Sequence, residues 1–141
     1  MSNANILPID TKEATLEIVG GKGRSLAEMV NAGLAVPGGF YVTTTAYRQY
    51  ILENNLQQKI IELAKPEIGE FTLSFDKASA AIQNIFMNES ISIEMAKEIT
   101  NAYTAIEGDI PPVAVRSSAN AEDLPDTVSY THLTLPTSDL V

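Results

Sequence analysis

Cysteine is absent from this chain of 141 residues, and basic residues are scarce. Without a thiol, the chain can form neither disulfide bonds nor thiolate-ligated metal sites. Nine lysines and arginines stand against 18 aspartates and glutamates, so the formal net charge is −9 and the isoelectric point is near 4.4. Phosphate backbones and anionic lipid surfaces repel such an acidic chain. We therefore expect neither nucleic acid nor a membrane among its partners.

Long apolar runs are also missing from the chain. No stretch approaches the roughly 20 residues that are needed to cross a bilayer. Residues 1–10 lack the basic start and the long apolar run of a secretory signal. The hydrophobic content of 45% is nevertheless ordinary for a globular protein, and 141 residues are enough for one domain with a core. These features predict a soluble, cytoplasmic protein.

What the chain does contain is an arginine between an apolar segment and a loop of small residues. Residues 113–115, Val-Ala-Val, are predicted to form a short buried strand, and Arg116 follows where that strand ends. Ser117 and Ser118 allow the backbone to turn tightly and supply hydroxyl and amide donors. A guanidinium beside such donors suits a phosphate group. The alternative interpretation of the same pattern is an ordinary strand-to-turn junction with a solvated arginine.

The second candidate element is a glycine-rich segment that contains a lysine. Its glycines, Gly20, Gly21 and Gly23, permit backbone geometry closed to other residues and leave room for a ligand. Lys22 adds a positive charge near the start of a predicted helix, where free N–H groups also favour anions. The glycine spacing and the missing Lys-Ser/Thr pair exclude a Walker A loop. A plain turn without a ligand is the alternative.

The predicted helix after these glycines covers residues 25–32. Ser25 followed by Glu28 matches a capping box, which indicates that Ser25 is the N-cap. Gly33 is expected to end the helix. If Ser25 caps it, Lys22 lies just outside the helix start, where an anion would bind.

The remainder of the chain is predicted to be mainly helical, with short strands at residues 6–9 and 40–42. Thr43, Thr44 or Thr45 can cap the helix that follows the second strand. Four apolar stripes at helical spacing predict four helices: Ala46, Tyr47, Tyr50 and Ile51; Leu56, Ile60, Leu63 and Ala64; Phe75, Ala78, Ile82 and Ile85; and Ile93, Ala96, Ile99, Tyr103 and Ile106. The expected fold class is α/β (α+β), helix-rich with a few short strands. Residues 57–107 carry no recognisable chemistry and are interpreted as scaffold.

Three motifs in order resemble the N-terminal region of the phosphoenolpyruvate synthase (pyruvate, water dikinase) and pyruvate phosphate dikinase family. Residues 20–29 are similar to its Gly-Gly-Lys-Gly/Asn-x-Ser-Leu-x-Glu-Met segment. Residues 36–44 match Val-Pro-x-Gly-Phe-x-x-Thr-Thr, and residues 114–125 match Ala-Val-Arg-Ser-Ser-Ala-x-Ala-Glu-Asp-x-Pro. The resemblance covers residues 18–126. Three ordered motifs are far more specific than any one of them alone.

The resemblance implies a partial ATP-grasp-type N-terminal lobe, in which ATP lies between two lobes. By this resemblance, Lys22 and Arg116 contact the ATP phosphates, with Ser117 and Ser118 as further donors. In the intact enzyme ATP phosphorylates a histidine, AMP and phosphate are released, and the histidine phosphorylates pyruvate to phosphoenolpyruvate. The resemblance also implies Mg²⁺, but the family's metal ligands have no counterpart in this sequence, so we assign no metal or catalytic residue. Glu122 and Asp123 are better explained as solvated or capping groups.

Two other functions remain open at this stage. A rifamycin phosphotransferase uses similar nucleotide chemistry on an antibiotic, and other domains would choose the acceptor. A non-catalytic nucleotide-binding module is the third interpretation.

The last residues do not follow the family pattern. Residues 1–127 are interpreted as an incomplete ATP-binding domain, and residues 128–141 as a non-native tail that resembles a translated sequencing adapter. His132, the single histidine, falls in that tail and receives no role. We therefore expect the chain alone to be an inactive N-terminal fragment of the enzyme.

Overall fold

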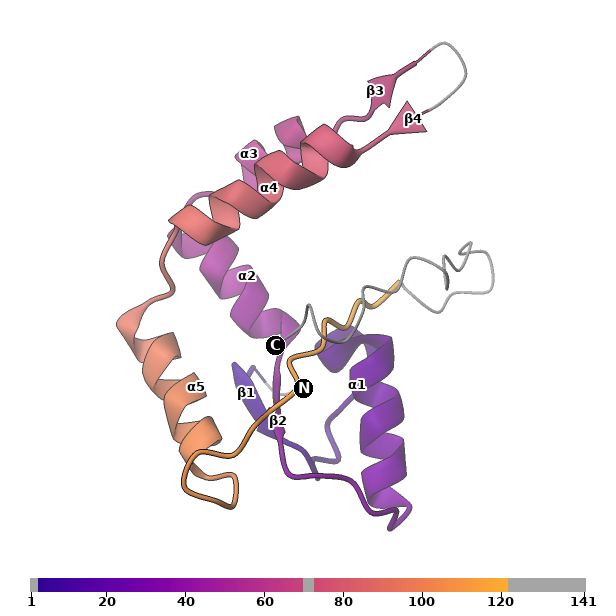
Figure 1. Cartoon of the computed structure of the whole chain (residues 1–141), viewed down its shortest axis with the longest axis vertical. Helices are drawn as coiled ribbons and strands as arrows, with labels where there is room; N and C mark the ends of the chain where they lie inside the picture. Colours follow the sequence, from indigo (N-terminus) through magenta and orange to yellow (C-terminus); the bar gives the residue numbers. More distant parts are fainter. Residues whose placement is uncertain (1–2, 70–72, 122–141) are drawn as a thin grey trace.

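The computed structural model describes residues 3–69 and 73–121. These residues form short strands and longer helices in the order β1 (Ile6–Pro8), α1 (Leu16–Asn31), β2 (Phe40–Val42), α2 (Thr44–Glu53), α3 (Gln57–Leu63), β3 (Glu67–Ile68), β4 (Leu73–Ser74), α4 (Asp76–Asn88) and α5 (Ile93–Thr104). The predicted α/β (α+β) class, helix-rich with a few short strands, is confirmed. Figure 1 shows the elements in sequence colours.

The strands β1 and β2 pair antiparallel and carry the first hydrophobic core. Leu7 lies opposite Tyr41 in the register, and both side chains are buried. Side chains alternate between the two faces of a strand, so these central residues point to the same side and pack against α1. Pro8 ends β1, a position where its missing N–H removes no central hydrogen bond. Both strands were predicted from the sequence, β2 with the same bounds.

Helix α1 begins much earlier than the sequence predicted. It starts after Thr15 and is interrupted at Gly20, whose φ of 73° and ψ of −179° are not helical. The prediction that Ser25 is the N-cap is therefore wrong, because Ser25 already lies inside the helix. Glu28 does not complete a capping box either; its carboxylate lies 3.4 Å from Arg24 in an exposed i,i+4 ion pair.

The other end of α1 agrees with the prediction that Gly33 stops the helix. Gly33 has a φ of +80°, and its N–H donates to the Val30 carbonyl. The N–H of Leu34 donates to the Met29 carbonyl, which completes a Schellman motif. Glycine is favoured here because a left-handed backbone is strained for residues with a Cβ.

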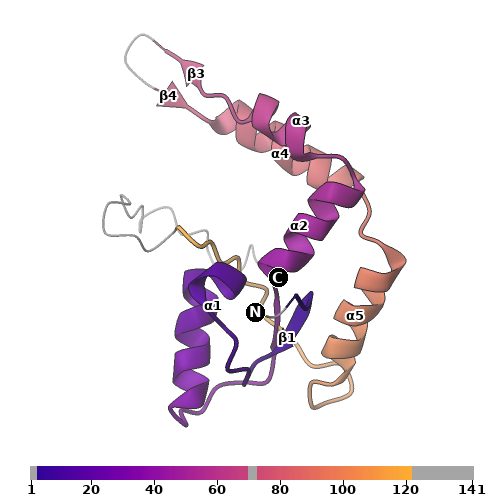
Figure 2. The same cartoon turned by 180° about the vertical axis from the view of Figure 1, so that it is seen from behind.

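The helices after β2 form an arm with a second core. Figures 1 and 2 show α2 leading away from β2 to α3 and α4, with the β3–β4 hairpin at the far end and α5 returning toward β1. All four helices follow the predicted apolar stripes, whereas the two-residue strands of the hairpin were not predicted. The buried residues of the second core are Ala46, Tyr50, Ile51, Leu56 and Met95.

The predicted buried strand at residues 113–115 is wrong. These residues have no strand partner within the described structure, and Val113 and Val115 are 43% and 71% exposed. A strand needs a neighbour to accept and donate its backbone hydrogen bonds. This segment instead has no regular secondary structure and follows Pro111, whose carbonyl accepts a hydrogen bond of 2.8 Å from the Tyr103 hydroxyl.

Candidate functional site

The glycine-rich segment and the segment after Arg116 contact each other, although 95 residues separate them in the sequence. The Gly23 N–H donates to the Ser118 Oγ over 3.1 Å. The Gly21 N–H donates to the Ala119 carbonyl over 3.0 Å. Both views show this last described segment crossing the N-terminal end of α1 (Figures 1 and 2). The structure therefore joins the two elements that the sequence singled out.

Gly20 makes this close approach possible. Its φ and ψ fall in a region that is essentially restricted to glycine. A Cβ added at Gly20 would lie 2.7 Å from both the carbonyl carbon and the carbonyl oxygen of Ser118. Such a contact is far shorter than van der Waals distance, so any larger residue at position 20 would push the Ser118 segment away.

Gly23 is held from the opposite side by the first core. A Cβ added there would lie 2.7 Å from the Val19 Cβ and 3.5 Å from the Tyr41 ring. Val19 and Tyr41 are both buried, and the Tyr41 hydroxyl donates to the Ile9 carbonyl over 3.1 Å. We call the kinked part of α1 from Gly20 to Gly23 the glycine turn. It rests on a packed base formed by β2 and the start of α1.

The glycines do not leave the room for a ligand that the sequence predicted. Ser118 fills the space beside Gly20, and core side chains fill the space beside Gly23. The N–H groups of Gly21 and Gly23, expected to face an anion, donate to protein oxygens instead. The physical reason is that these glycines allow two segments of the chain to approach closely, which uses both the space and the donors.

The candidate phosphate-binding side chains flank this contact. Lys22 is half-buried in α1, between the two glycines whose N–H groups reach the other segment. Arg116 and Ser117 are exposed, and Ser118 is half-buried. Arg116 precedes Ser118 by two residues, so their Cα atoms lie within about 7 Å. The contact therefore brings the Lys22 backbone and the Arg116 backbone into one region of the surface.

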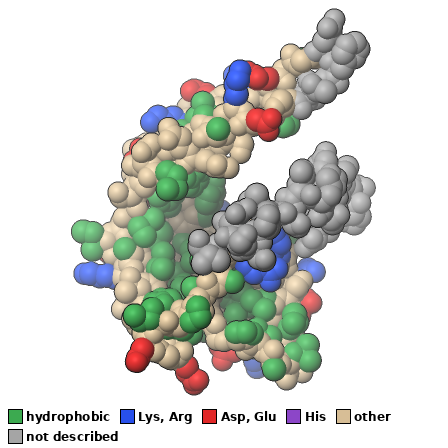
Figure 3. Space-filling view, in the orientation of Figure 1, with side chains coloured by type: hydrophobic (Ala, Val, Ile, Leu, Met, Phe, Trp, Pro, Cys, Tyr) green, Lys and Arg blue, Asp and Glu red, His purple; other side chains and the backbone are tan. Residues whose placement is uncertain are grey.

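Basic side chains gather around this region in an otherwise acidic chain. In Figure 3 a group of Lys and Arg side chains lies over the end of α1 where the C-terminal described segment crosses it. Arg24, the third basic residue of the two elements, pairs with Glu28. An exposed ion pair of this kind contributes little to stability. Arg116 forms no ion pair within the described residues, which leaves its guanidinium available to an anion.

From the sequence, Ala119 was one of the small residues that let the backbone turn after Arg116, but its contact with Gly21 was not predicted. Its contribution is a backbone carbonyl, and a carbonyl leaves no signal in the residue type. The one available signal was the small size of residues 117–119, which permits close backbone approach.

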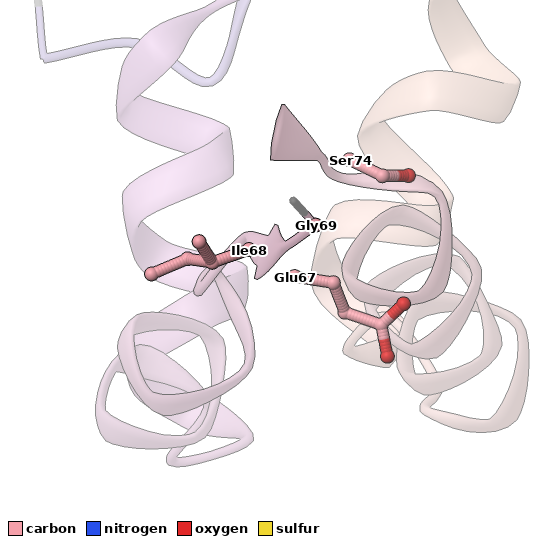
Figure 4. A pocket seen from close by; sticks show the side chains of 4 residues that line it. All are labelled: Glu67, Ile68, Gly69 and Ser74. Atoms are coloured by element: carbon pink, nitrogen blue, oxygen red, sulfur yellow. The ribbon is translucent and has the colours of Figure 1, made fainter. Parts of the chain in front are cut away.

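Elsewhere, the described residues supply no competing site. No three His, Cys, Asp or Glu side chains within residues 3–69 and 73–121 lie close enough together to hold a metal ion. A hollow of about 410 Å³ lies on the β3–β4 hairpin, lined by Glu67, Ile68, Gly69 and Ser74 (Figure 4). The Glu67 carboxylate already forms an ion pair with the Lys77 ammonium at 2.7 Å, so we assign the hollow no role. Among the described helices, none is both long and apolar enough to cross a membrane.

Comparison with known families defines the class of protein to which this fold and site belong. The family described as "Pyruvate phosphate dikinase, AMP/ATP-binding domain" matches residues 16–129. This match includes the Gly20–Gly23 turn and the segment from Arg116 to Ala119. The chain belongs to this family, which confirms the resemblance found in the sequence.

Individual relatives support the same assignment. A probable phosphoenolpyruvate synthase of Methanocaldococcus jannaschii is 41% identical over 115 residues, which cover 79% of this chain and 10% of that protein. The phosphoenolpyruvate synthase of Aeropyrum pernix is 36% identical over 122 residues, covering 79% and 14%. That of Pseudomonas aeruginosa is 38% identical over 117 residues, covering 79% and 15%. The chain therefore spans only 10–15% of the length of these relatives.

Proposed function

We propose that this chain supplies an ATP-binding part of a phosphoenolpyruvate synthase-like dikinase. One observation carries the proposal: the contact of Gly21 and Gly23 with Ser118 and Ala119 joins the two elements that contain Lys22 and Arg116. In a chain of an AMP/ATP-binding family, two cations joined in this way suit a polyphosphate. An ATP substrate is also consistent with the cytoplasmic location that the composition predicts.

In this proposal Lys22 and Arg116 bind the ATP phosphates from the two sides of the contact. The planar guanidinium of Arg116 can donate two parallel hydrogen bonds to phosphate oxygens, whereas the Lys22 ammonium acts as a compact charge. Ser117 and Ser118 add hydroxyl or amide donors. Both cations would stabilise the negative charge that develops during phosphoryl transfer, where positioning and electrostatics supply most of the catalysis.

The reaction of the whole enzyme is part of the same proposal. ATP phosphorylates a histidine outside the described residues, with release of AMP and phosphate, and pyruvate then accepts the phosphoryl group to give phosphoenolpyruvate. Mg²⁺, when bound, would neutralise phosphate charge. The described residues bring no set of three acidic or histidine ligands together, so we assign no ligand to the ion and derive no step through it.

Removal of each cation tests the phosphate-binding roles. Lys22→Ala and Arg116→Ala are each expected to weaken equilibrium binding of ATP by about tenfold to a hundredfold, the range for a hydrogen bond to a charged group. Isothermal titration of the full chain measures the dissociation constant. At high salt, each substitution is expected to weaken ATP binding by a smaller factor. Salt screens the attraction of Lys22 and Arg116 for phosphate in the unsubstituted chain, so less affinity is left to lose.

Two exposed cations on the arm provide matched controls. Lys59→Ala on α3 and Arg48→Ala on α2 remove the same charges away from the contact, and we expect ATP affinity within about twofold of the original chain. Unchanged affinity in both Lys22→Ala and Arg116→Ala would contradict the proposal and favour a module that does not use this region for phosphate.

A further inference from the structure

We propose that Ser118 and Gly20 act as positioning residues that seat the Arg116 segment on α1. This inference rests on the proposed function, because it assigns Arg116 to ATP. The inference adds that Ser118 and Gly20 position the arginine, whereas the arginine itself binds phosphate.

The first step of the argument is the hydrogen bonding of Ser118. Its Oγ accepts from the Gly23 N–H, and the neighbouring Ala119 carbonyl accepts from Gly21. These two hydrogen bonds join the adjacent residues Ser118 and Ala119 to Gly23 and Gly21 of the glycine turn. Two attachment points fix both the position and the orientation of the segment that contains Ser118. A hydroxyl has one hydrogen to donate and two lone pairs, so Ser118 can hold Gly23 and still donate to a phosphate.

The second step is that few hydrogen bonds from the described residues hold the stretch between Pro111 and Ala119 in place. Between the Pro111 carbonyl and Ala119, the hydrogen bonds to the rest of the described chain are the two made to Gly21 and Gly23. Residues 113–117 have no strand partner in the part of the chain that the structure describes, and all of them are exposed. The backbone of Arg116 is therefore located mainly by the anchor that follows two residues later.

The third step is the energetic consequence for binding. A segment that is not anchored must lose conformational freedom when the phosphate binds, and this loss weakens the measured affinity. The anchor removes that freedom beforehand. Loss of the anchor should therefore weaken ATP binding even though the Arg116 side chain is intact.

Two substitutions break the anchor from opposite sides. Ser118→Ala removes the acceptor of the Gly23 N–H. Gly20→Ala introduces a Cβ against the Ser118 carbonyl group. Gly20 has no side chain with which to touch ATP, so a loss of affinity in Gly20→Ala identifies positioning rather than direct contact.

The experiment combines amide hydrogen exchange without nucleotide and ATP titration of the full chain. We expect Ser118→Ala to speed exchange at Gly23 by about fivefold or more, the factor for one neutral hydrogen bond. Gly20→Ala should speed exchange at both Gly21 and Gly23. Both variants should weaken ATP binding by about tenfold. Thermal unfolding is followed in parallel, so that a general loss of folding is recognised.

Two controls match these changes outside the contact. Ser25→Ala removes an exposed hydroxyl from the same helix. Gly33→Ala places a side chain at another positive φ, where a new Cβ would meet no atom within 4 Å. Neither control should change exchange at Gly21 and Gly23 or the affinity for ATP, although Gly33→Ala should lower thermal stability.

The outcomes separate this inference from the proposed function. If the unsubstituted chain fails to bind ATP, the proposed function is contradicted, and the positioning role falls with it. If the unsubstituted chain binds ATP but the Gly20→Ala and Ser118→Ala variants, while folded, bind it equally well, the positioning role alone is overturned. Unchanged amide exchange in Ser118→Ala would show that the anchor does not form.

Discussion

Tyr41 and Tyr50 are both buried, but their hydroxyl groups meet different surroundings. The Tyr41 hydroxyl donates to the Ile9 carbonyl, whereas the Tyr50 hydroxyl has no hydrogen-bond partner among the described residues. We therefore predict that Tyr41→Phe costs about 1 kcal/mol of unfolding free energy, while Tyr50→Phe is neutral or stabilising by up to about 1 kcal/mol. Urea unfolding at neutral pH measures both. An equal loss in the two variants would contradict this interpretation.

The same tyrosines predict how stability depends on alkaline pH. Burial raises the pKa of Tyr41 and of Tyr50 above 10.0, and the nearby Glu89 carboxylate raises the pKa of Tyr50 further. The folded chain therefore keeps these protons more strongly than the unfolded chain. The resulting stability is fully present below about pH 10 and is lost as the pH rises through the folded pKa values.

Urea unfolding across this pH range, with Tyr50→Phe as the comparison, checks the prediction. The unsubstituted chain should lose unfolding free energy above pH 10, and Tyr50→Phe should lose less. Identical pH profiles would show that Tyr50 does not contribute to the decline.

At the residue scale, the sequence predicted which residues lie near the contact better than it predicted what they contact. It singled out Lys22, Arg116, Ser117 and Ser118, and the structure places them around one contact. It did not predict that Ser118 would accept from Gly23, because this bond depends on the tertiary approach of segments 95 residues apart. Whether these residues bind ATP stays a prediction.

At the scale of elements, Thr43 caps α2. Its hydroxyl donates to the Ala4 carbonyl over 2.7 Å and accepts from the Ala46 N–H over 3.4 Å, and the side chain is buried. One residue therefore joins the helix start to the segment before β1. The sequence allowed three neighbouring threonines as the cap, and the structure selects this one.

We predict that Thr43→Ala lowers the unfolding free energy by about 2 kcal/mol, because it removes a helix cap and a buried hydrogen bond together. Thr43→Ser keeps the hydroxyl and should recover most of the loss. Thr45→Ala, a neighbouring threonine on α2, should change stability by less than about 0.5 kcal/mol. Thermal unfolding monitored by circular dichroism checks the series; an equal effect at Thr45 would argue against this capping role.

Elements with an apolar stripe were predictable, and those set by tertiary contacts were not. The stripes from Ala46 to Ile106 each became a helix because helical spacing alone places those side chains on one face. The strand expected at residues 113–115 failed because an apolar run does not provide a partner strand. The start of α1 was missed because the glycine-rich residues were interpreted as a loop, whereas helical residues lie on both sides of the non-helical Gly20.

At the scale of the whole molecule, many large apolar side chains remain exposed. Val113, Val115 and Ile110 lie on the segment that approaches the site, and Ile93 and Met87 lie on the arm. The two cores are small and separate. We predict that the chain alone is marginally stable and binds the dye ANS, because exposed apolar surface attracts both the dye and other copies. ANS fluorescence and size-exclusion chromatography test this; a monomer without ANS binding would contradict it.

A further prediction at this scale is that the chain alone does not turn over ATP. The proposed reaction passes through a phosphohistidine, and the one histidine of the sequence, His132, lies outside the described residues and is assigned no role. We therefore predict that the chain forms no AMP when it is incubated with ATP. Chromatography of the nucleotides measures this, and AMP above the level of a protein-free control would contradict the prediction.

The central claim is that the glycine turn and the Arg116 segment form one ATP-binding region. Amide hydrogen exchange of the full chain with and without ATP tests it most directly. We predict slower exchange with ATP at residues 20–23 and at residues 116–119 together, with little change in α3 and α4. No change at either segment, with ATP present at saturating concentration, would contradict the account.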